Sequence, residues 1–152
     1  MERITSFCVD HDKLDVGLYI SRIDGDIVTY DLRMKKPNCD DYLSASQAHT
    51  IEHILATFMR NSAVKDSVIY VGPMGCRTGF YLLIRNPDHK EIIKILTDAF
   101  YYIANFEGTI PGSMKKECGN YLDHDVIGAK KVTETYCRIL EKWSVNNLQY
   151  NC

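Results

Sequence analysis

Four segments of the chain carry the side-chain pattern of β-strands. They are rich in β-branched and aromatic residues and are bounded by turn-forming residues. The first two are joined by Asp24-Gly25, which suits the positive backbone angles of a type I′ turn and therefore predicts a β-hairpin. The predicted strands are residues 17–23, 26–33, 67–71 and 79–85.

Three other segments place apolar residues three and four positions apart, which is the spacing of an amphipathic helix. Ser44 and Gln47 are predicted to form a capping box at the start of the first helix. Asn86 is predicted to cap the second helix, with Pro87 at its first position. The predicted helices are residues 44–61, 86–106 and 125–144.

The order of these elements (strands, helix, strands, helix, helix) favours an α+β fold in which an antiparallel β-sheet packs against helices. The chain has 152 residues, which suits one domain. Its 45% of hydrophobic residues are enough to form a core without disulfide bonds. We therefore predict a single domain that covers residues 1–152.

Charge and composition argue against several classes of protein. The formal net charge is −2 and the sequence pI is about 6.2, so the chain lacks the basic surface of a nucleic-acid-binding protein. No apolar stretch is long enough for a membrane helix, and the N-terminal residues lack the apolar region of a signal peptide. We expect a cytoplasmic protein, whose six cysteines are thiols rather than disulfides.

The pattern H-x-x-E-H at residues 49–53 places chemically active groups on the first predicted helix. Residues four apart lie on the same side of a helix, so His49 and His53 could bind one metal ion. Glu52 lies close to this face, where its carboxylate could transfer a proton near the metal without being a ligand. A solvated polar face would show the same pattern, because the two histidines lie opposite the apolar stripe.

The surroundings of the two histidines favour a metal site over a solvated surface. Ala45 and Ala56 on the same face are small and leave room for an approaching group. Cys118, in a predicted loop, could be a third ligand, and two imidazoles with one thiolate leave a fourth tetrahedral position open for catalysis. His124, close to Cys118 in the sequence, is an alternative third ligand.

Two other functions are compatible with the same residues. The H-x-x-E-H order also occurs in the inverzincin peptidases, which normally use a downstream glutamate as third ligand, and Glu134 is the remote candidate here. A metal-stabilised binding domain without catalytic activity would instead fill all four positions with protein ligands. The three functions therefore predict different ligand sets.

Several short motifs, taken in order along the chain, form a more specific pattern. They are Ser6-Phe7 with Asp10-His11, Asp31-Leu32-Arg33 before Pro37-Asn38, the H-x-x-E-H segment, Met59-Arg60-Asn61, P-M-G-C-R-T-G-F-Y at residues 73–81, and C-G-N-Y-L-D-H-D at residues 118–125. Together these motifs span nearly the whole chain. In this pattern the sequence resembles the S-ribosylhomocysteine lyase family.

The resemblance implies a role for each candidate in the site. Members of the family bind one divalent metal, natively iron(II) and replaceable by zinc or cobalt, through residues that match His49, His53 and Cys118. Their two acid/base groups match Glu52 and Cys76. A nearby metal or cation would favour the thiolate form of such a cysteine. Without the resemblance, Cys76 could equally be a small buried residue in a tight turn.

The resemblance also implies the reaction and the assembly. S-ribosylhomocysteine would be cleaved to homocysteine and 4,5-dihydroxy-2,3-pentanedione, the precursor of autoinducer-2, by carbonyl migration and β-elimination of the thioether. Members are homodimers with active sites at the subunit interface. Many members have Asp-Ile-Ser where this chain has Tyr70-Val71-Gly72, which puts one substrate contact in doubt. The positions that match substrate-binding residues of the family are Ser6, His11, Arg33 and Arg60.

Overall fold

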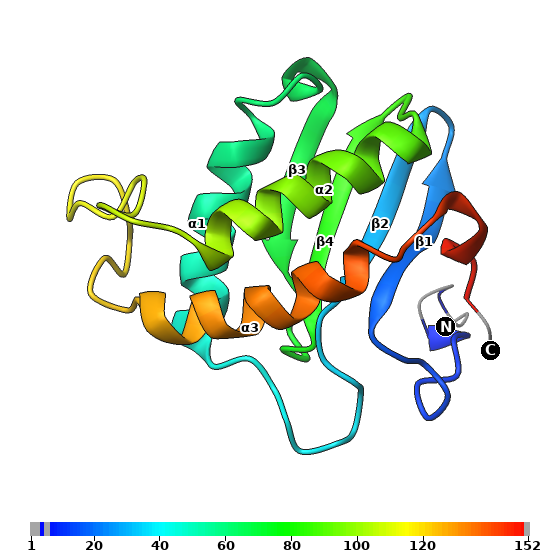
Figure 1. Cartoon of the computed structure of the whole chain (residues 1–152), viewed down its shortest axis with the longest axis horizontal. Coiled ribbons are helices and arrows are strands. Elements are labelled where there is room, and N and C mark those ends of the chain that lie inside the picture. The colour runs from blue at the N-terminus through cyan, green and yellow to red at the C-terminus, as the bar shows by residue number, and fades with distance from the viewer. Residues whose placement is uncertain (1–3, 5–6, 151–152) are drawn as a thin grey trace.

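A four-stranded antiparallel sheet forms the centre of the structure, a computed structural model that describes residue 4 and residues 7–150 (Figure 1). The strand order is β1-β2-β4-β3, and each neighbouring pair is antiparallel. The prediction of an α+β fold with an antiparallel sheet is therefore confirmed. The strands are β1 (Gly17–Asp24), β2 (Ile27–Arg33), β3 (Val68–Pro73) and β4 (Gly79–Arg85).

The helices lie against the sheet and against one another. Helices α2 and α3 cross one face of the sheet, whereas α1 packs against β3 (Figure 1). Within the described residues, no helix combines the length and the apolar composition needed to cross a bilayer. The helices are α1 (Ala45–Met59), α2 (His89–Ala104) and α3 (Val126–Leu140), with two short 3-10 turns at Lys65–Ser67 and Val145–Asn147.

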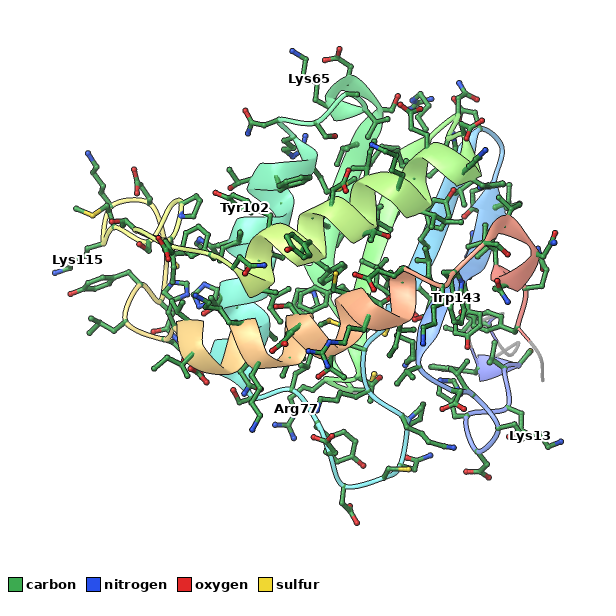
Figure 2. The ribbon with its side chains drawn as sticks, viewed as in Figure 1. Lys13, Lys65, Arg77, Tyr102, Lys115 and Trp143 are labelled. Carbon is green, nitrogen blue, oxygen red and sulfur yellow. The ribbon has the colours of Figure 1, made fainter. Side chains whose placement is uncertain are left out.

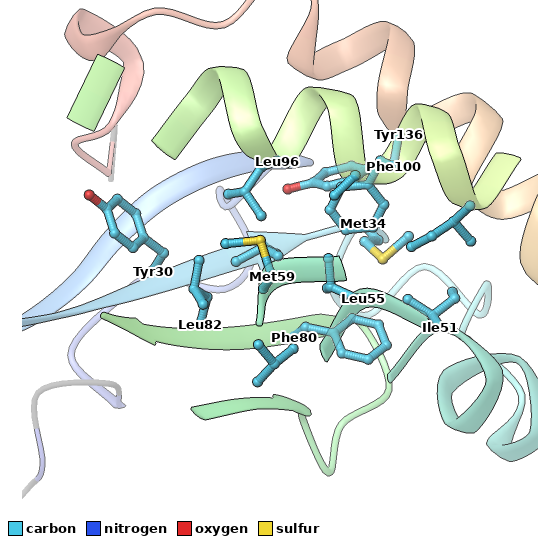
Figure 3. Close-up of a cluster of buried hydrophobic side chains, with 14 of the residues drawn as sticks. Tyr30, Met34, Ile51, Leu55, Met59, Phe80, Leu82, Leu96, Phe100 and Tyr136 are labelled. Carbon is cyan, nitrogen blue, oxygen red and sulfur yellow. The ribbon is translucent and has the colours of Figure 1, made fainter. Parts of the chain in front are cut away.

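The hydrophobic core fills the space between the sheet and the helices (Figure 3). Because side chains alternate along a strand, every second residue of β2 points to the helices. Val28, Tyr30 and Leu32 are buried there, which leaves Asp31 and Arg33 on the opposite face. That face therefore carries the ion pair of Asp31 and Arg33. The largest fully buried side chains include Tyr30, Tyr136, Phe80, Phe100, Leu18, Leu32, Leu43, Ile51, Ile54, Leu55, Met59 and Leu82.

The close approach of β2 and β4 places the turn that carries Cys76 beside the end of β2. Gly79 pairs with Arg33, and a Cβ atom on Gly79 would collide with the backbone oxygen of Leu32. Only glycine allows this approach. The Thr78 carbonyl then accepts hydrogen bonds from the backbone N–H groups of Met34 and Lys35, both at 2.9 Å.

The predicted start of the second helix is wrong. Helix α2 begins after Asp88, whose carboxylate accepts a hydrogen bond from the Glu91 backbone N–H at 2.8 Å. Asn86 instead adopts a left-handed backbone conformation with φ of 44°. The Asp88 side chain can cap the first turn, so the helix starts two residues later than the Asn-Pro pair suggests. The last helix also ends earlier, at Leu140.

The capping box of α1 is confirmed. The Ser44 hydroxyl accepts a hydrogen bond from the Gln47 N–H at 3.1 Å, and the Gln47 side chain accepts one from the Ser44 N–H at 3.0 Å. Replacing Ser44 with alanine removes one of these bonds and is expected to lower the free energy of unfolding by about 1 kcal/mol. Urea denaturation measures this change, and Thr57→Ala, which removes an exposed hydroxyl near the other end of the same helix, is the control. An equal loss in both variants would contradict the role of the cap.

Candidate active site

Helix α1 and the loop between α2 and α3 bring together four side chains that can bind a metal. His49 and His53 project from successive turns of α1, and Cys118 and His124 come from the loop, whose outer part carries Lys115 (Figure 2). One ligand atom from each of the four lies within 4.8 Å of the others. The Cys118 Sγ is 3.3 Å from the His49 Nε2. Two ligands of one tetrahedral zinc ion would lie about 3.5 Å apart, so this spacing fits a metal site.

Backbone carbonyl groups fix the orientation of both α1 histidines. The His49 Nδ1 donates to the Asp123 carbonyl and the His53 Nδ1 to the Pro111 carbonyl, each at 2.8 Å. A carbonyl can only accept, so the proton of each neutral ring is on Nδ1 and the lone pair is on Nε2. This arrangement is typical of histidines that bind metals. It also excludes the alternative of a solvated polar face, because both rings are half-buried and held by the loop.

His124 presents a third imidazole lone pair to the same cluster. The Thr50 hydroxyl donates to the Ser46 carbonyl at 2.8 Å and accepts from the Asp125 N–H at 2.9 Å. Its remaining lone pair accepts from the His124 Nδ1 at 3.2 Å, which leaves a lone pair on the His124 Nε2.

The His124 Nε2 is buried and has no hydrogen-bond partner in the described part of the chain. The ring of His124 stacks on that of His49, with centroids 4.2 Å apart. Burial, together with His49 and His53, lowers the pKa of His124 below its usual value, which favours the neutral ring. A buried lone pair without a partner, beside two more imidazoles and a thiol, fits a divalent cation.

The ligand set argues against the peptidase alternative. Glu134, its candidate ligand, lies on α3 and forms an ion pair with Arg138 at 2.6 Å. It is not part of the cluster, which contains Cys118 instead. Glu52 is half-buried on α1 directly before His53, and within the described residues its carboxylate forms no hydrogen bond or ion pair. Its carboxylate is therefore available to accept a proton.

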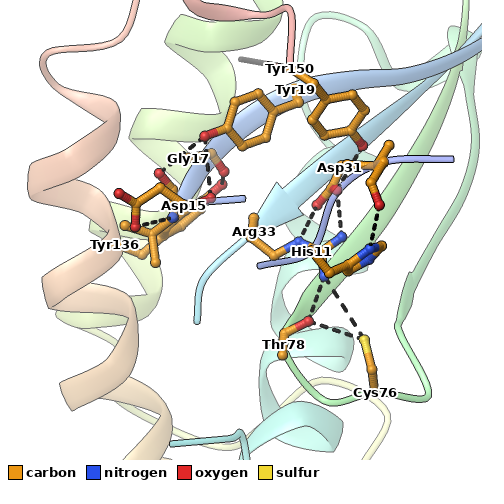
Figure 4. Close-up of polar contacts among 12 residues, drawn as sticks. His11, Asp15, Gly17, Tyr19, Asp31, Arg33, Cys76, Thr78, Tyr136 and Tyr150 are labelled. Atoms are coloured by element: carbon orange, nitrogen blue, oxygen red, sulfur yellow. Dashed lines mark hydrogen bonds and ion pairs between the residues drawn. The ribbon is translucent and has the colours of Figure 1, made fainter. Parts of the chain in front are cut away.

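A second polar cluster surrounds Cys76 in the turn between β3 and β4 (Figure 4). The Cys76 thiol is exposed, so the alternative of a small buried residue is wrong. Its Sγ lies 3.1 Å from the Thr78 Oγ1 and 4.0 Å from the Arg33 Nη1. Arg33 also donates to the Thr78 Oγ1 at 2.6 Å.

A buried ion pair holds Arg33 in this position. Its Nε and Nη2 donate to the two carboxylate oxygens of Asp31 at 3.1 and 2.6 Å, and only 3% and 0% of the two side chains are exposed. Burial disfavours the charged guanidinium, but Asp31 outweighs it and raises the pKa of Arg33. A positive charge therefore lies beside the thiol, with the Arg33 Nη1 4.0 Å from the Cys76 Sγ.

The other predicted substrate-binding residues fall in three places. His11 and Cys76 line a pocket of about 300 Å³, so the structure brings these two together. Arg60 follows the end of α1 and donates to the carbonyls of Val68 and Ile69, and within the described residues it has no hydrogen bond to either cluster. Ser6 lies outside the described residues.

Tyr70 and Gly72, which stand where many family members have Asp and Ser, pack against each other. The ring of Tyr70 covers Gly72, where a Cβ atom would collide with the Tyr70 hydroxyl. Tyr70 is half exposed and lies on β3 near the carbonyls that Arg60 binds. The roles of Thr50, Thr78 and Tyr150 could not be predicted, because a single hydroxyl carries no periodic or spacing signal. Thr78 lies within the motif at residues 73–81, but the motif does not show that its hydroxyl contacts Arg33 and Cys76.

Comparison with known proteins identifies the family of the chain. The sequence model of the S-Ribosylhomocysteinase (LuxS) family matches residues 4–147. The S-ribosylhomocysteine lyase of Borrelia garinii subsp. bavariensis is 45% identical over 156 residues, which cover 99% of each chain. The S-ribosylhomocysteine lyases of Desulfotalea psychrophila and Porphyromonas gingivalis are 45% and 44% identical over 157 residues, again with 99% of each chain covered. The metal cluster and these full-length matches place the chain in the S-ribosylhomocysteine lyase (LuxS) family.

Proposed function

We propose that the chain is a metal-dependent lyase that cleaves S-ribosylhomocysteine to homocysteine and 4,5-dihydroxy-2,3-pentanedione. The observation that carries this proposal is the half-buried cluster of imidazoles and thiol on α1 and its neighbouring loop, in a chain of this family. The cleavage is an elimination after carbonyl migration along the sugar, and the product is the precursor of autoinducer-2. The reaction occurs in the cytoplasm, where thiols such as the five free cysteines of the described residues persist.

The metal ligands in this proposal are His49, His53 and Cys118. Two nitrogens and one sulfur suit iron(II), zinc or cobalt, and we assign iron(II) as the ion in the cell. Three protein ligands leave a coordination position for oxygens of the sugar, and the His124 Nε2 faces this cluster without being a required ligand. A bound metal would act as a Lewis acid that stabilises negative charge on those oxygens.

Two groups of the chain would move the protons. Each carbonyl migration removes a proton from one sugar carbon and returns a proton to another atom. The Glu52 carboxylate, beside the metal ligands, accepts and returns protons near the metal end of the sugar. The Cys76 sulfur, which has the Arg33 guanidinium beside it, would do so from the other side of the sugar. His11 and Arg33 would contact the substrate around Cys76, and Ser6 and Arg60 are assigned further substrate contacts.

A homodimer with interfacial active sites would bring the two clusters together. Glu52 lies on α1 and Cys76 in the β3–β4 turn, so the two proposed proton carriers come from different elements of one subunit. An apolar groove beside the metal cluster supports an interface there. Tyr102 and Phe58, whose rings are 5.4 Å apart, line it together with Pro111, next to the carbonyl that holds His53 (Figure 2). Exposed apolar side chains of this kind are common at subunit interfaces.

The direct test is release of a thiol from S-ribosylhomocysteine. Protein loaded with iron(II) or cobalt under anaerobic conditions is expected to release one homocysteine thiol per substrate consumed, measured with a thiol reagent after the protein is removed. The same protein after metal removal is the matched control and should release none. Failure of a sample with one metal per subunit to release thiol above the control would contradict the proposed function.

A further inference from the structure

The C-terminal segment crosses the edge of the sheet and reaches the face that carries Asp31 and Arg33. After α3, the Trp143 Nε1 donates to the Leu18 carbonyl at 2.7 Å, and the Leu148 carbonyl accepts from the Ile20 N–H at 2.7 Å. Leu148 is buried in the core. The segment is therefore fastened along β1 before it passes to the opposite face, where Tyr150 lies (Figure 4).

Tyr150 binds the buried carboxylate of Asp31. Its hydroxyl donates to the Asp31 Oδ2 at 2.8 Å, and its ring stacks on that of Tyr19 with centroids 5.0 Å apart. Tyr19 is the residue of β1 that pairs with Asp31 across the sheet. Burial and the Asp31 charge raise the pKa of Tyr150, so the hydroxyl keeps its proton and remains a donor.

Asp31 needs this donor because it has little contact with water. A buried carboxylate is stable only when its oxygens receive hydrogen bonds. Arg33 supplies one bond to each oxygen, and Tyr150 supplies the second bond to Oδ2. With Asp31 fixed on both sides, the remaining Nη1 of Arg33 points to Thr78 and Cys76. Three consecutive contacts, Tyr150 to Asp31, Asp31 to Arg33 and Arg33 to Cys76, thus connect the C-terminal segment to the exposed thiol.

We infer that Tyr150 is a positioning residue for the reaction. Its hydroxyl orients Asp31, Asp31 orients Arg33, and Arg33 keeps a positive charge beside the Cys76 thiol. This inference deepens the proposed function, because it assumes that Cys76 acts as an acid/base group. The polar groups around Cys76 are Arg33 from β2, Thr78 and Arg77 from its own turn, His11 from the N-terminal segment, Tyr42 from the segment before α1 and Tyr81 from β4.

The test is the alkylation rate of Cys76 in the variant Tyr150→Phe, with iodoacetamide and peptide mass spectrometry. The substitution keeps the ring on Tyr19 and removes only the hydroxyl. We expect alkylation of Cys76 at neutral pH to slow by about threefold to tenfold, which is the rate factor that corresponds to the free energy of one hydrogen bond. The increase of the alkylation rate with pH should also move to higher pH. Tyr101→Phe, which removes an exposed hydroxyl on α2, is the matched control and should leave both unchanged.

The other cysteines distinguish positioning from loosening of the fold. The exposed Cys8 and Cys39 should react at the same rate in all variants, and the buried Cys137 should stay protected. An unchanged rate of Cys76 alkylation in Tyr150→Phe would overturn the inference. Faster alkylation of the buried Cys137 in this variant would also overturn it, because it would show that the substitution loosens the fold. Because no substrate is present, either result is independent of whether the protein cleaves S-ribosylhomocysteine.

Discussion

Replacing Cys118 with alanine is expected to abolish stable metal binding, and with it thiol release from S-ribosylhomocysteine. Loss of this ligand leaves His49 and His53, on one helix, as the remaining assigned ligands, and two imidazoles bind a divalent ion only weakly. Loss of a group that merely orients a ligand lowers metal affinity by about 10- to 100-fold, so we expect a larger decrease here. Metal content after dialysis, together with competition against a chelator, measures the change.

The matched control is His124→Gln. His124 is stacked on His49 and its Nε2 is buried in the same cluster, so its loss is expected to weaken binding by no more than about 100-fold. In cobalt-loaded samples, the sulfur-to-metal charge-transfer absorption should persist in His124→Gln and vanish in Cys118→Ala. The opposite result, with metal retained in Cys118→Ala and lost in His124→Gln, would show that the third ligand is His124.

Replacing Glu52 with glutamine is expected to lower kcat by about 10²- to 10⁴-fold while metal stays bound. Glutamine has the same shape but cannot accept the proton that the elimination releases. The carboxylate has no ion pair or hydrogen bond within the described residues, so its replacement disturbs no structural contact. Steady-state kinetics of thiol release and metal analysis of the same sample provide the two measurements.

An exposed glutamate in the loop after α2 provides a control that tests whether the loss of one negative charge is enough to lower kcat. Glu107→Gln removes the same charge outside the two clusters and should leave kcat unchanged. A Glu52→Gln variant with normal kcat would remove Glu52 from the proton transfers. Loss of metal from that variant would instead indicate that the carboxylate supports the metal ligands.

Local patterns predicted the features of the fold that depend on neighbours in sequence. The β-hairpin of the first two strands and the capping box of Ser44 both involve residues close in sequence, and both were confirmed. The turn itself was predicted one residue too early: Asp24 pairs with Ile27, so Gly25-Asp26 joins the strands, and Gly25 is the turn residue with a positive φ, at 61°. The start of α2 was predicted wrongly because two capping signals compete there. Asn86-Pro87 and Asp88 are both suitable, and the Asp88 side chain reaches the orphan N–H of Glu91.

The candidate site was predictable where its residues share one helix or match the family. His49 and His53 lie on the same face of α1, and Cys118 reaches them as predicted. The surroundings of Cys76 were not predictable in this way. Arg33 reaches the thiol through the register of β2 and β4, and Tyr150 reaches Asp31 only after the chain has crossed β1. Contacts of this kind depend on topology, which side-chain spacing does not reveal.

The connection between Tyr150 and Asp31 also bears on the order of folding. It joins residues 119 positions apart, whereas the hydrogen bonds between α1 and the loop of the metal cluster join residues 58 to 75 positions apart. Longer loops cost more entropy to close, and contacts distant in sequence form more slowly. We therefore expect the C-terminal segment to dock late in folding. A molecule that has loaded its metal but not docked this segment would count as holoenzyme in a metal assay while its thiol was not yet activated.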